Sequence, residues 1–420
     1  MWRFLWMLGL IAADAVVLAD DWPRFRGPTG MGQTSERGLP TRWNADRNEN
    51  VVWKASLPGA SDQNRLDQNQ SSPVVWGDAV LITTSFWPAG RPVHEFPEHH
   101  VARYRASDGR LMWDVQIEPG PWKLSDLRGG YTAPTPTVDG ERVYVVFGSA
   151  VLAALDFNGR VVWRHEFPDF QAFDVAIAGS PVVDGKQVLV LCDKSQQKGV
   201  ISAFDGKTGA LHWQQKRPGV TFAHSTPVIA TIHGKRQILV SASNALQGLN
   251  LADGSVAWWV NTPGDVCSPV LAADVIYSDS GRGGPGVIVE PGGAGDLTAT
   301  HIKFRVAQIP EGLSSPVAVE HLLYRLHNPA VLKCFDLQTG AALYSTRLEG
   351  VSVASSPVAT PEGRVYFGSA GKTYVVQAGP QFTLLETNDL GDPGPASMAV
   401  SGGRLFFKGK QFLFCIGSTP

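Results

Sequence analysis

Imidazole and carboxylate side chains gather in residues 94–100, a stretch that carries His94, Glu95, Glu98, His99 and His100. These are side-chain types that bind zinc and similar ions in proteins. The stretch therefore has two interpretations, a metal site or a solvated insertion loop. We expect the loop, and we assign no metal site.

Two other patterns in the sequence have little chemical meaning. Residues 281–286 read GRGGPG, but a glycine-rich phosphate cradle needs a strand before it and a helix after it. No such context is predicted here, so we expect a hairpin loop. The sequence contains no G-x-S-x-G elbow, so we propose no hydrolase triad and no catalytic residue.

The four cysteines are far apart and have no CxxC spacing, so they do not form a redox or zinc motif. The repeat described below places them in different structural units. We expect buried free thiols at Cys192, Cys267, Cys334 and Cys415.

Three long segments, residues 59–71, 86–100 and 118–131, carry side chains suited to recognition. Aromatic residues and arginine supply most of the binding energy at protein interfaces. The candidate set in these segments is Arg65, Trp87, Arg91, Trp122, Arg128 and Tyr131. The alternative is that these loops only cover the protein, with Trp87 and Trp122 packed inward.

The composition excludes some classes of partner. The chain has 420 residues, 36 Lys and Arg, and 38 Asp and Glu, which gives a net charge of −2. Non-specific nucleic-acid binding needs a basic face, so we expect no nucleic-acid partner. No apolar run reaches the roughly 18 residues of a membrane span.

A repeated motif organises most of the chain. A Ser or Thr, a Pro and two mostly β-branched residues recur at intervals of 40 to 63 residues. The copies begin at Ser72, Thr135, Ser180, Thr226, Ser268, Ser315 and Ser356, with a degenerate copy around Ser397. Eight units of about forty residues are typical of a repeat architecture.

A second motif closes most units. A glycine precedes a tryptophan by four residues at Trp113, Trp163, Trp213 and Trp258. The glycine permits the positive φ of a tight hairpin turn. A tryptophan at one fixed place in successive units would fill the space between them, so we expect these side chains in the core.

Each unit reads as four short antiparallel strands, which is the blade of a β-propeller. We predict an all-β, eight-bladed propeller over residues 51–420. The last unit lacks a fourth strand, and we expect Val51–Leu57 to supply it and close the ring. The fifth unit lacks the usual turn, with Gly295–Thr298 in its place and Phe304 in the place of the tryptophan.

Residues 203–213, AFDGKTGALHW, and residues 335–340, FDLQTG, resemble the pyrroloquinoline-quinone (PQQ) type repeat. The resemblance extends from Val51 to Gly417. It implies either quinoprotein alcohol dehydrogenases, which bind PQQ and Ca²⁺ on the propeller axis, or BamB-like propellers, which are non-enzymatic. The opening residues 21–28, DWPRFRGP, are similar to a third group of exported PQQ-like propellers.

The binding interpretation is favoured over the enzymatic one. The dehydrogenases that this chain resembles carry adjacent cysteines beside the quinone, and no two cysteines are adjacent here. No constellation of Glu, Asn and Asp matches their Ca²⁺ site. We therefore expect a non-enzymatic scaffold that binds an envelope protein, peptide or glycan, with no cofactor. The alternative is a quinoprotein oxidoreductase with PQQ and Ca²⁺.

The topology of a blade predicts which face would bind. Links between the second and third strands, and links between blades, lie on the same face of a propeller. The three long segments belong to these links and flank the first blade, so we expect them to cluster. His224 and Asp265 precede inner strands of later blades and should lie at the axial mouth of this face.

The N-terminus has the features of a targeting segment. Arg3 precedes an apolar stretch that is interrupted by Asp14, and Val17–Ala19 resembles a cleavage site. We expect a signal peptide over residues 1–19, an N-terminal extension over residues 20–50, and no transmembrane span after cleavage. The mature protein would be periplasmic or extracellular.

Overall fold

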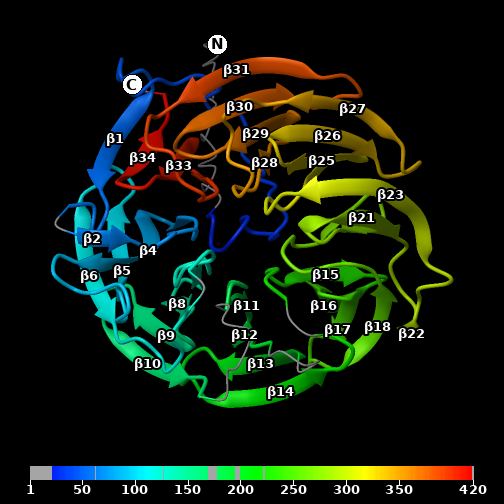
Figure 1. Cartoon of the computed structure of the whole chain (residues 1–420), viewed down its shortest axis with the longest axis horizontal. Coiled ribbons are helices and arrows are strands. Elements are labelled where there is room, and N and C mark those ends of the chain that lie inside the picture. The colour runs from blue at the N-terminus through cyan, green and yellow to red at the C-terminus, as the bar shows by residue number, and fades with distance from the viewer. Residues whose placement is uncertain are drawn as a thin grey trace, which may run out of the picture.

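The structure is a computed structural model that describes residues 21–61, 63–125, 127–168, 177–193, 199–220 and 223–418. Its strands form eight sheets around a central axis (Figure 1). Four strands of each sheet follow one another in antiparallel order from the axis outwards. The eight-bladed β-propeller predicted from the sequence is confirmed. The expected signal peptide, residues 1–19, lies outside the described residues.

The first four blades, with their strands in order from the axis, are as follows. Blade 1 contains β3 (Val74–Trp76), β4 (Ala79–Pro88), β5 (Glu98–Arg105) and β6 (Leu111–Ile117), with β2 (Gln63–Leu66) added to β4. Blade 2 contains β7 (Thr137–Val138), β8 (Arg142–Phe147), β9 (Val151–Asp156) and β10 (Val161–Glu166). Blade 3 contains β11 (Val182–Asp184), β12 (Gln187–Leu191), β13 (Gly199–Asp205) and β14 (Leu211–Arg217). Blade 4 contains β15 (Val228–Ile232), β16 (Lys235–Ala242), β17 (Ala245–Asn250) and β18 (Val256–Asn261).

The other four blades continue around the ring. Blade 5 contains β19 (Val270–Ala272), β20 (Val275–Ser278), β21 (Arg282–Val289) and β23 (Ile302–Glu311). Blade 6 contains β24 (Val317–Val319), β25 (Leu322–His327), β26 (Val331–Asp336) and β27 (Ala342–Arg347). Blade 7 contains β28 (Val358–Ala359), β29 (Arg364–Gly368), β30 (Lys372–Gln377) and β31 (Thr383–Asp389). Blade 8 contains β32 (Ala399–Ser401), β33 (Arg404–Lys408), β34 (Phe412–Ile416) and β1 (Val51–Ser56).

The N-terminal strand closes the ring as predicted. Strand β1 pairs with β34 in antiparallel register, with Trp53 opposite Cys415. The indole of Trp53 then reaches blade 1, where its Nε1 donates to the carbonyl of Ala106 at 2.9 Å. First and last blades are therefore joined by backbone pairing and by a buried aromatic side chain.

The repeated glycine and tryptophan pack against each other between blades. Trp163 of blade 2 lies over Gly209 of blade 3, where a Cβ atom would come within 2.7 Å of the ring. Its Nε1 donates to the carbonyl of Gly206 at 2.9 Å. Trp113 makes the same contacts one blade earlier, with Gly159 and the carbonyl of Phe157. Trp258 is fully buried, whereas Trp113, Trp163 and Trp213 are half-buried and pack against the buried clusters, so the expected packing role is confirmed and full burial is seen for Trp258.

Blade 5 departs from the repeated pattern. Some of its departures were predicted from the sequence, and others were not. Phe304 packs over Gly340 of blade 6, so it occupies the tryptophan place as predicted. Residues 290–301, which include Gly295–Thr298, link β21 to β23 in place of the usual short turn, as predicted, and make the outer hairpin of blade 5 longer. Within this link, β22 (Gly295–Asp296) pairs in parallel with β18 and extends blade 4, which was not predicted. The prediction of a hairpin loop at residues 281–286 is wrong, since residues from Arg282 onwards belong to the irregular strand β21.

The N-terminal extension crosses the axis, which the sequence did not reveal. Trp22 is buried and exchanges two backbone hydrogen bonds of 2.9 Å with Val75 of blade 1. Further along the extension, Leu271 of blade 5, which is opposite blade 1 in the ring, donates its backbone N–H to Sδ of Met31 at 3.3 Å, and Ala359 of blade 7 donates to the carbonyl of Gly32 at 2.8 Å. The deep-blue segment in the middle of Figure 1 follows this path. The sequence DWPRFRGP is thus a structural element that ties distant blades together.

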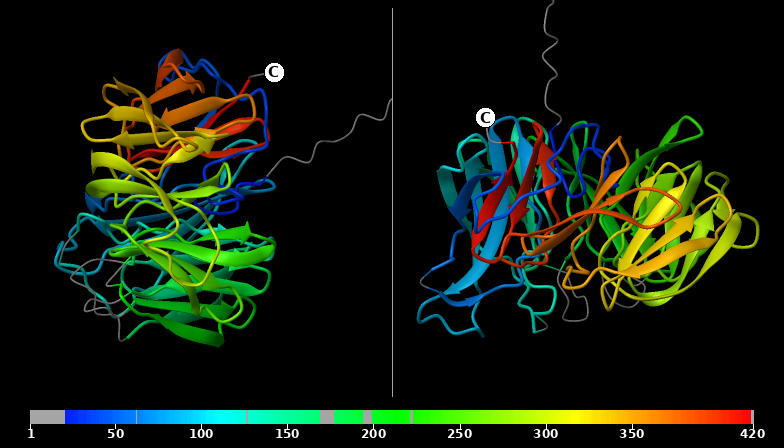
Figure 2. Two further views of the ribbon diagram at one scale, coloured as in Figure 1. Left: turned by 90° about the vertical axis from the view of Figure 1, so that its right-hand side faces the viewer. Right: turned by 90° about the horizontal axis from the view of Figure 1, so that it is seen from above.

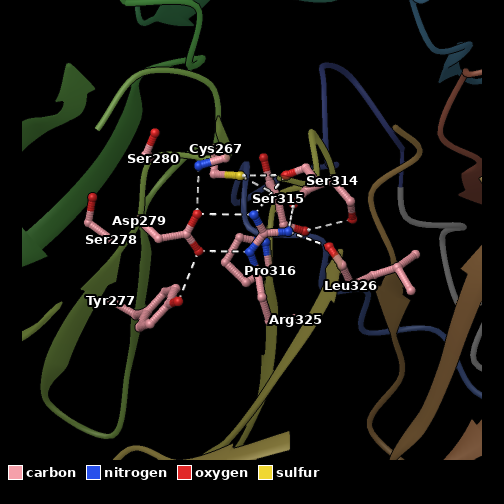
Figure 3. A network of polar contacts seen from close by, with 12 residues as sticks. Cys267, Tyr277, Ser278, Asp279, Ser280, Ser314, Ser315, Pro316, Arg325 and Leu326 are labelled. Atoms are coloured by element: carbon pink, nitrogen blue, oxygen red, sulfur yellow. Dashed lines mark hydrogen bonds and ion pairs between the residues drawn. The ribbon is translucent and has the colours of Figure 1, made fainter. Parts of the chain in front are cut away.

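A buried ion pair joins blade 5 to blade 6. Arg325 of blade 6 donates to Asp279 of blade 5 through Nε at 2.7 Å and through Nη2 at 3.0 Å (Figure 3). Its Nη2 also donates to the carbonyl of Gly312 at 2.7 Å. Burial raises the pKa of Asp279, but the adjacent guanidinium outweighs it, and the net shift is downward. Both charges are therefore compensated.

The four cysteines are buried free thiols, as expected. Among the described residues, no helix is long and apolar enough to cross a membrane.

Candidate functional site

A closed belt of hydrogen bonds surrounds the axis and explains the Ser/Thr of the repeated motif. The backbone N–H of each motif residue donates to the hydroxyl oxygen of its counterpart in the next blade. Thr135 N donates to Ser180 Oγ at 3.0 Å, and Ser180 N to Thr226 Oγ1 at 3.1 Å. The remaining donors are Ser72, Thr226, Ser268, Ser315, Ser356 and Ser397, at 2.8 to 3.2 Å. The belt fixes the inner ends of all eight blades.

An axial cavity of about 280 Å³ lies inside this belt. Every link between consecutive blades contributes to its lining, and Phe25 of the N-terminal extension contributes as well. Four belt residues, Ser180, Thr226, Ser315 and Ser397, are part of the wall. The charged side chains of the lining are Arg128, His224, Arg282 and Glu311. The cavity on the axis thus combines a largely apolar wall with three basic side chains and one acidic side chain among its described lining residues.

His224, Asp265 and Arg282 form one connected group at this cavity. Asp265 is 3% exposed. Its Oδ1 lies 2.7 Å from Nδ1 of His224, and its Oδ2 accepts from Nε of Arg282. Nη2 of Arg282 lies 3.4 Å from the same histidine nitrogen. Asp265 therefore holds two basic side chains against the cavity, as the axial placement of His224 and Asp265 predicted; Arg282 was not predicted.

The three long segments meet in space, and we call their described residues within 59–71, 86–100 and 118–131 the loop platform. Trp87, Leu124 and Tyr131 form a small hydrophobic cluster of their own, flanked by Phe96 and Trp122. The loops of blade 1 project from one side of the disc (Figure 2, right). Platform and axial cavity are contiguous, because Gln70 and Arg128 belong to both.

Two candidate recognition residues are structural. Trp87 and Tyr131 are each 1% exposed, so they cannot present their rings to a partner. The indole Nε1 of Trp87 donates to the carbonyl of Glu95 at 2.9 Å, and the phenol of Tyr131 accepts from Leu124 N at 3.0 Å. The prediction is wrong for these two, because an insertion of this length needs its own apolar core to hold one conformation.

The other candidates lie at or near the surface. Arg65 is exposed, with its Cζ 5.6 Å from the centre of the Trp87 ring. Arg91 pairs with Glu98 at 3.1 Å. Trp122 is half-buried, and Arg128 is exposed at the cavity. Lys123 is also exposed, with its Nζ 5.8 Å from the centre of the Phe96 ring, and sequence reasoning missed it.

The histidines of residues 94–100 do not converge on a metal. His99 is fully buried on β5, where its ring nitrogens lie 2.8 Å from Ser85 Oγ and 3.0 Å from Ser149 Oγ. Burial lowers the pKa of His99 to about 3, so the imidazole is neutral. His94 is exposed. The expected solvated loop is therefore correct for the start of the segment and wrong for its strand residues.

A quinone with Ca²⁺, the alternative implied by the resemblance, does not fit the axial residues. Ca²⁺ takes about six to eight oxygen ligands. Glu311 is the carboxylate that lines the cavity, and Asp265 behind the wall is already engaged by Arg282 and His224. Within the described ranges, no three His, Cys, Asp or Glu side chains are grouped so that they could hold a metal. We therefore assign no reaction step to such a group.

The fold defines the class of this chain, an eight-bladed β-propeller, and its repeats are similar to the PQQ-like type. Residues 97–284 match the family model described as outer membrane protein assembly factor BamB. The resemblance expected from the repeat motifs is thereby confirmed.

Two relatives carry that same name. The outer membrane protein assembly factor BamB of Moranella endobia (strain PCIT) is 25% identical over 236 residues, which cover 52% of this chain and 58% of the relative. BamB of Yersinia pestis is 24% identical over 301 residues, covering 66% of this chain and 68% of the relative. The match therefore spans less than two thirds of the Moranella endobia protein.

Solved structures of a methanol dehydrogenase and of a BamB have the same fold as this chain. A europium-containing methanol dehydrogenase superposes with a TM-score of 0.67 at 12% identity, covering 94% of this chain and 89% of its own. BamB from Moraxella catarrhalis superposes with a TM-score of 0.57 at 15% identity, covering 87% of this chain and 98% of its own. At these identities the likeness shows the architecture alone.

Proposed function

We propose that this propeller is an exported, non-enzymatic scaffold that binds an envelope protein or peptide through the loop platform. The observation that carries the proposal is the platform itself. Two of the three insertions around blade 1 share a buried cluster, and the third joins them where the Asp67 carboxylate accepts from Tyr131 N at 2.7 Å. Together they hold a defined surface beside the axial cavity. Function in repeat proteins concentrates on loops that a rigid scaffold positions.

The relatives support a protein as the partner. Their name describes an assembly factor of outer membrane proteins, so a partner within that machinery fits this chain, and its place of action would be the periplasm. A glycan is the competing ligand, and the test below distinguishes the two.

Exposed basic residues are the contacts that we assign to recognition. Arg65 and Lys123 lie over aromatic rings that are part of the platform. The packed rings restrict these long side chains, which lowers the entropy lost on binding. Trp122 and Arg128 extend the same surface toward the axis.

The test is photo-crosslinking in envelope extracts from a reporter amino acid at the position of Arg65. A matched reporter replaces Arg160, which is 79% exposed on the turn before the outer strand of blade 2. We expect one protein to be captured from the first position and not from the second. The variant Arg65→Glu/Lys123→Glu should weaken the captured complex by about tenfold, a loss of about 1.4 kcal/mol, with the melting temperature unchanged. Capture from both positions alike, or binding of a purified glycan instead, would contradict the proposal.

A further inference from the structure

The N-terminal extension closes one end of the axial cavity. The links between blades form the wall, and they lie on the platform face. The extension contacts turns between first and second strands, which lie on the opposite face (Figure 2, right). There Gly77 N donates to Asp21 Oδ1 at 2.7 Å, and Gly403 N donates to Glu36 Oε2 at 2.6 Å. Between these points the extension bonds to inner strands of blades 1, 2, 5, 6 and 7. Phe25 therefore lies at the closed end.

The charged side chains at the cavity compensate one another. Arg128, Arg282 and Glu311 line the cavity and are exposed. Asp265 is buried behind the wall, where it accepts from Arg282 and lies 2.7 Å from His224. The positive charges of two arginines are thus matched by two carboxylates. A charged ligand would have to compete with these groups for their partners, so the charges favour an uncharged ligand.

Carbon atoms form much of the remaining wall. Phe25 at the closed end, Val266 and Leu313 on the sides, and alanines from several other links are all partly exposed in the cavity. Ligand pockets in proteins are typically apolar with a few polar groups, and their volumes are roughly 300–1,000 Å³. This cavity, at about 280 Å³, is at the lower end of that range. It suits one side chain with its adjoining peptide groups.

The axial belt adds neutral hydrogen-bond donors to this wall. The hydroxyl oxygens of Ser180, Thr226, Ser315 and Ser397 each accept a backbone N–H of the belt. A hydroxyl also has one O–H to donate, and in the part of the chain that the structure describes no acceptor receives these four. A peptide carries one carbonyl acceptor per residue. The belt can therefore bind the backbone of a ligand whose side chain lies against the apolar wall.

We propose that the axial cavity binds one uncharged apolar side chain, such as that of leucine, with its flanking peptide carbonyls. The segment that carries it belongs to the protein bound on the loop platform, so this inference rests on the proposed function and defines the chemistry of the partner. Gln70 and Arg128 belong to both the platform and the cavity. A chain that lies on the platform can therefore enter the cavity without crossing another part of the protein.

The test is saturation-transfer NMR of the purified full chain with three blocked tripeptides. Their common form is acetyl-Gly-X-Gly-amide, in which X is Leu, Glu or Lys. We expect the leucine peptide to bind and the two charged peptides to bind about tenfold more weakly or not at all. The proposal is overturned if the leucine peptide does not bind, or if a charged peptide binds as well as it does.

Variants then locate the site. Ala178→Phe and Ala354→Phe place a ring in the cavity from two different links, and both alanines are partly exposed there. Each variant should weaken binding of the leucine peptide about tenfold with the melting temperature unchanged. Ala210→Phe, on the exposed turn before the outer strand of blade 3, is the matched control and should bind normally. Equal binding by Ala178→Phe, Ala354→Phe and Ala210→Phe would place the site elsewhere and refute the proposal.

A variant at the closed end tests the fit independently of cavity filling. Phe25→Ala enlarges the cavity, so it should bind acetyl-Gly-Trp-Gly-amide better than the leucine peptide, the reverse of the wild type. An unchanged preference would contradict the assignment of Phe25 to the floor of the site. The crosslink from Arg65 reports on the platform alone. Capture of a protein there without peptide binding would refute this inference and leave the proposed function standing, whereas loss of both would refute both.

Discussion

The backbone N–H of Ser397 donates to Oγ of Ser72 across 3.2 Å, which joins the inner ends of the last and first blades. The two residues are the degenerate and the first copy of the repeated motif. Their contact completes the axial belt, so ring closure occurs at the inner strands as well as at β1 on the outer edge.

Removing the acceptor of this contact should destabilise the ring. Ser72→Ala leaves a buried N–H without a partner, which costs about 1–3 kcal/mol. Ser35→Ala, at an exposed position of the N-terminal extension, is the matched control and should cost little. Denaturant unfolding of the two variants measures the difference. Equal midpoints would show that the belt contributes nothing to stability.

The packing of tryptophan over glycine can be separated from the backbone requirement for glycine. Gly209 has φ +73° and lies under the Trp163 ring, whereas Gly403 has φ +72° and nothing within 4 Å of its Cβ position. Alanine pays the left-handed backbone cost, about 1–2 kcal/mol, at both places. Gly209→Ala should lose about 1–3 kcal/mol more because of overpacking. Thermal unfolding compares them, and identical losses would exclude the steric role of the ring.

Lys408 should make stability depend on pH. Its Nζ is buried between blades 8 and 1, where it donates to Ser71 Oγ at 2.6 Å and to the carbonyl of Thr83 at 3.0 Å. Burial lowers the pKa of Lys408 to about 7 from 10.5. Between these values the unfolded chain holds a proton that the folded chain lacks, so the free energy of unfolding rises with pH, by up to about 1.4 kcal/mol per unit.

The matched variants are Lys408→Met and Lys410→Met, the latter at an exposed position two residues away. Unfolding is measured from pH 7 to pH 10. The wild type and Lys410→Met should gain stability over this range relative to Lys408→Met. A parallel pH dependence of all three proteins would refute the assignment.

A double variant can test whether the charge of Asp279 must be compensated by Arg325 for the protein to be stable. Arg325→Met leaves the Asp279 carboxylate buried and uncompensated, at a cost of about 3–5 kcal/mol. Arg325→Met/Asp279→Asn removes that charge while the amide oxygen still accepts hydrogen bonds, so the double variant should be more stable than the single one. Denaturant titration decides this, and a double variant no more stable than Arg325→Met would speak against the electrostatic cause.

The repeat made the architecture predictable from local sequence. The spacing of the motifs predicted the number of blades, the closure by Val51–Leu57 and the place of Phe304, and the structure confirms these. Each of these features depends on a turn, a strand or a packing position that recurs about every forty residues. Its place in one unit can therefore be predicted from its place in the other units.

Tertiary structure decided what happens where the repeat is interrupted. Nothing in the local sequence indicated that Trp22 would pair with Val75 of blade 1, that β22 would join blade 4, or that Trp87 and Tyr131 would be buried under their own loops. Arg282 meets His224 through Asp265 because two links between blades and the first residue of β21 converge near one axis. These contacts join residues that are far apart in the chain, and a periodic pattern carries no information about which non-repeated segments pack together.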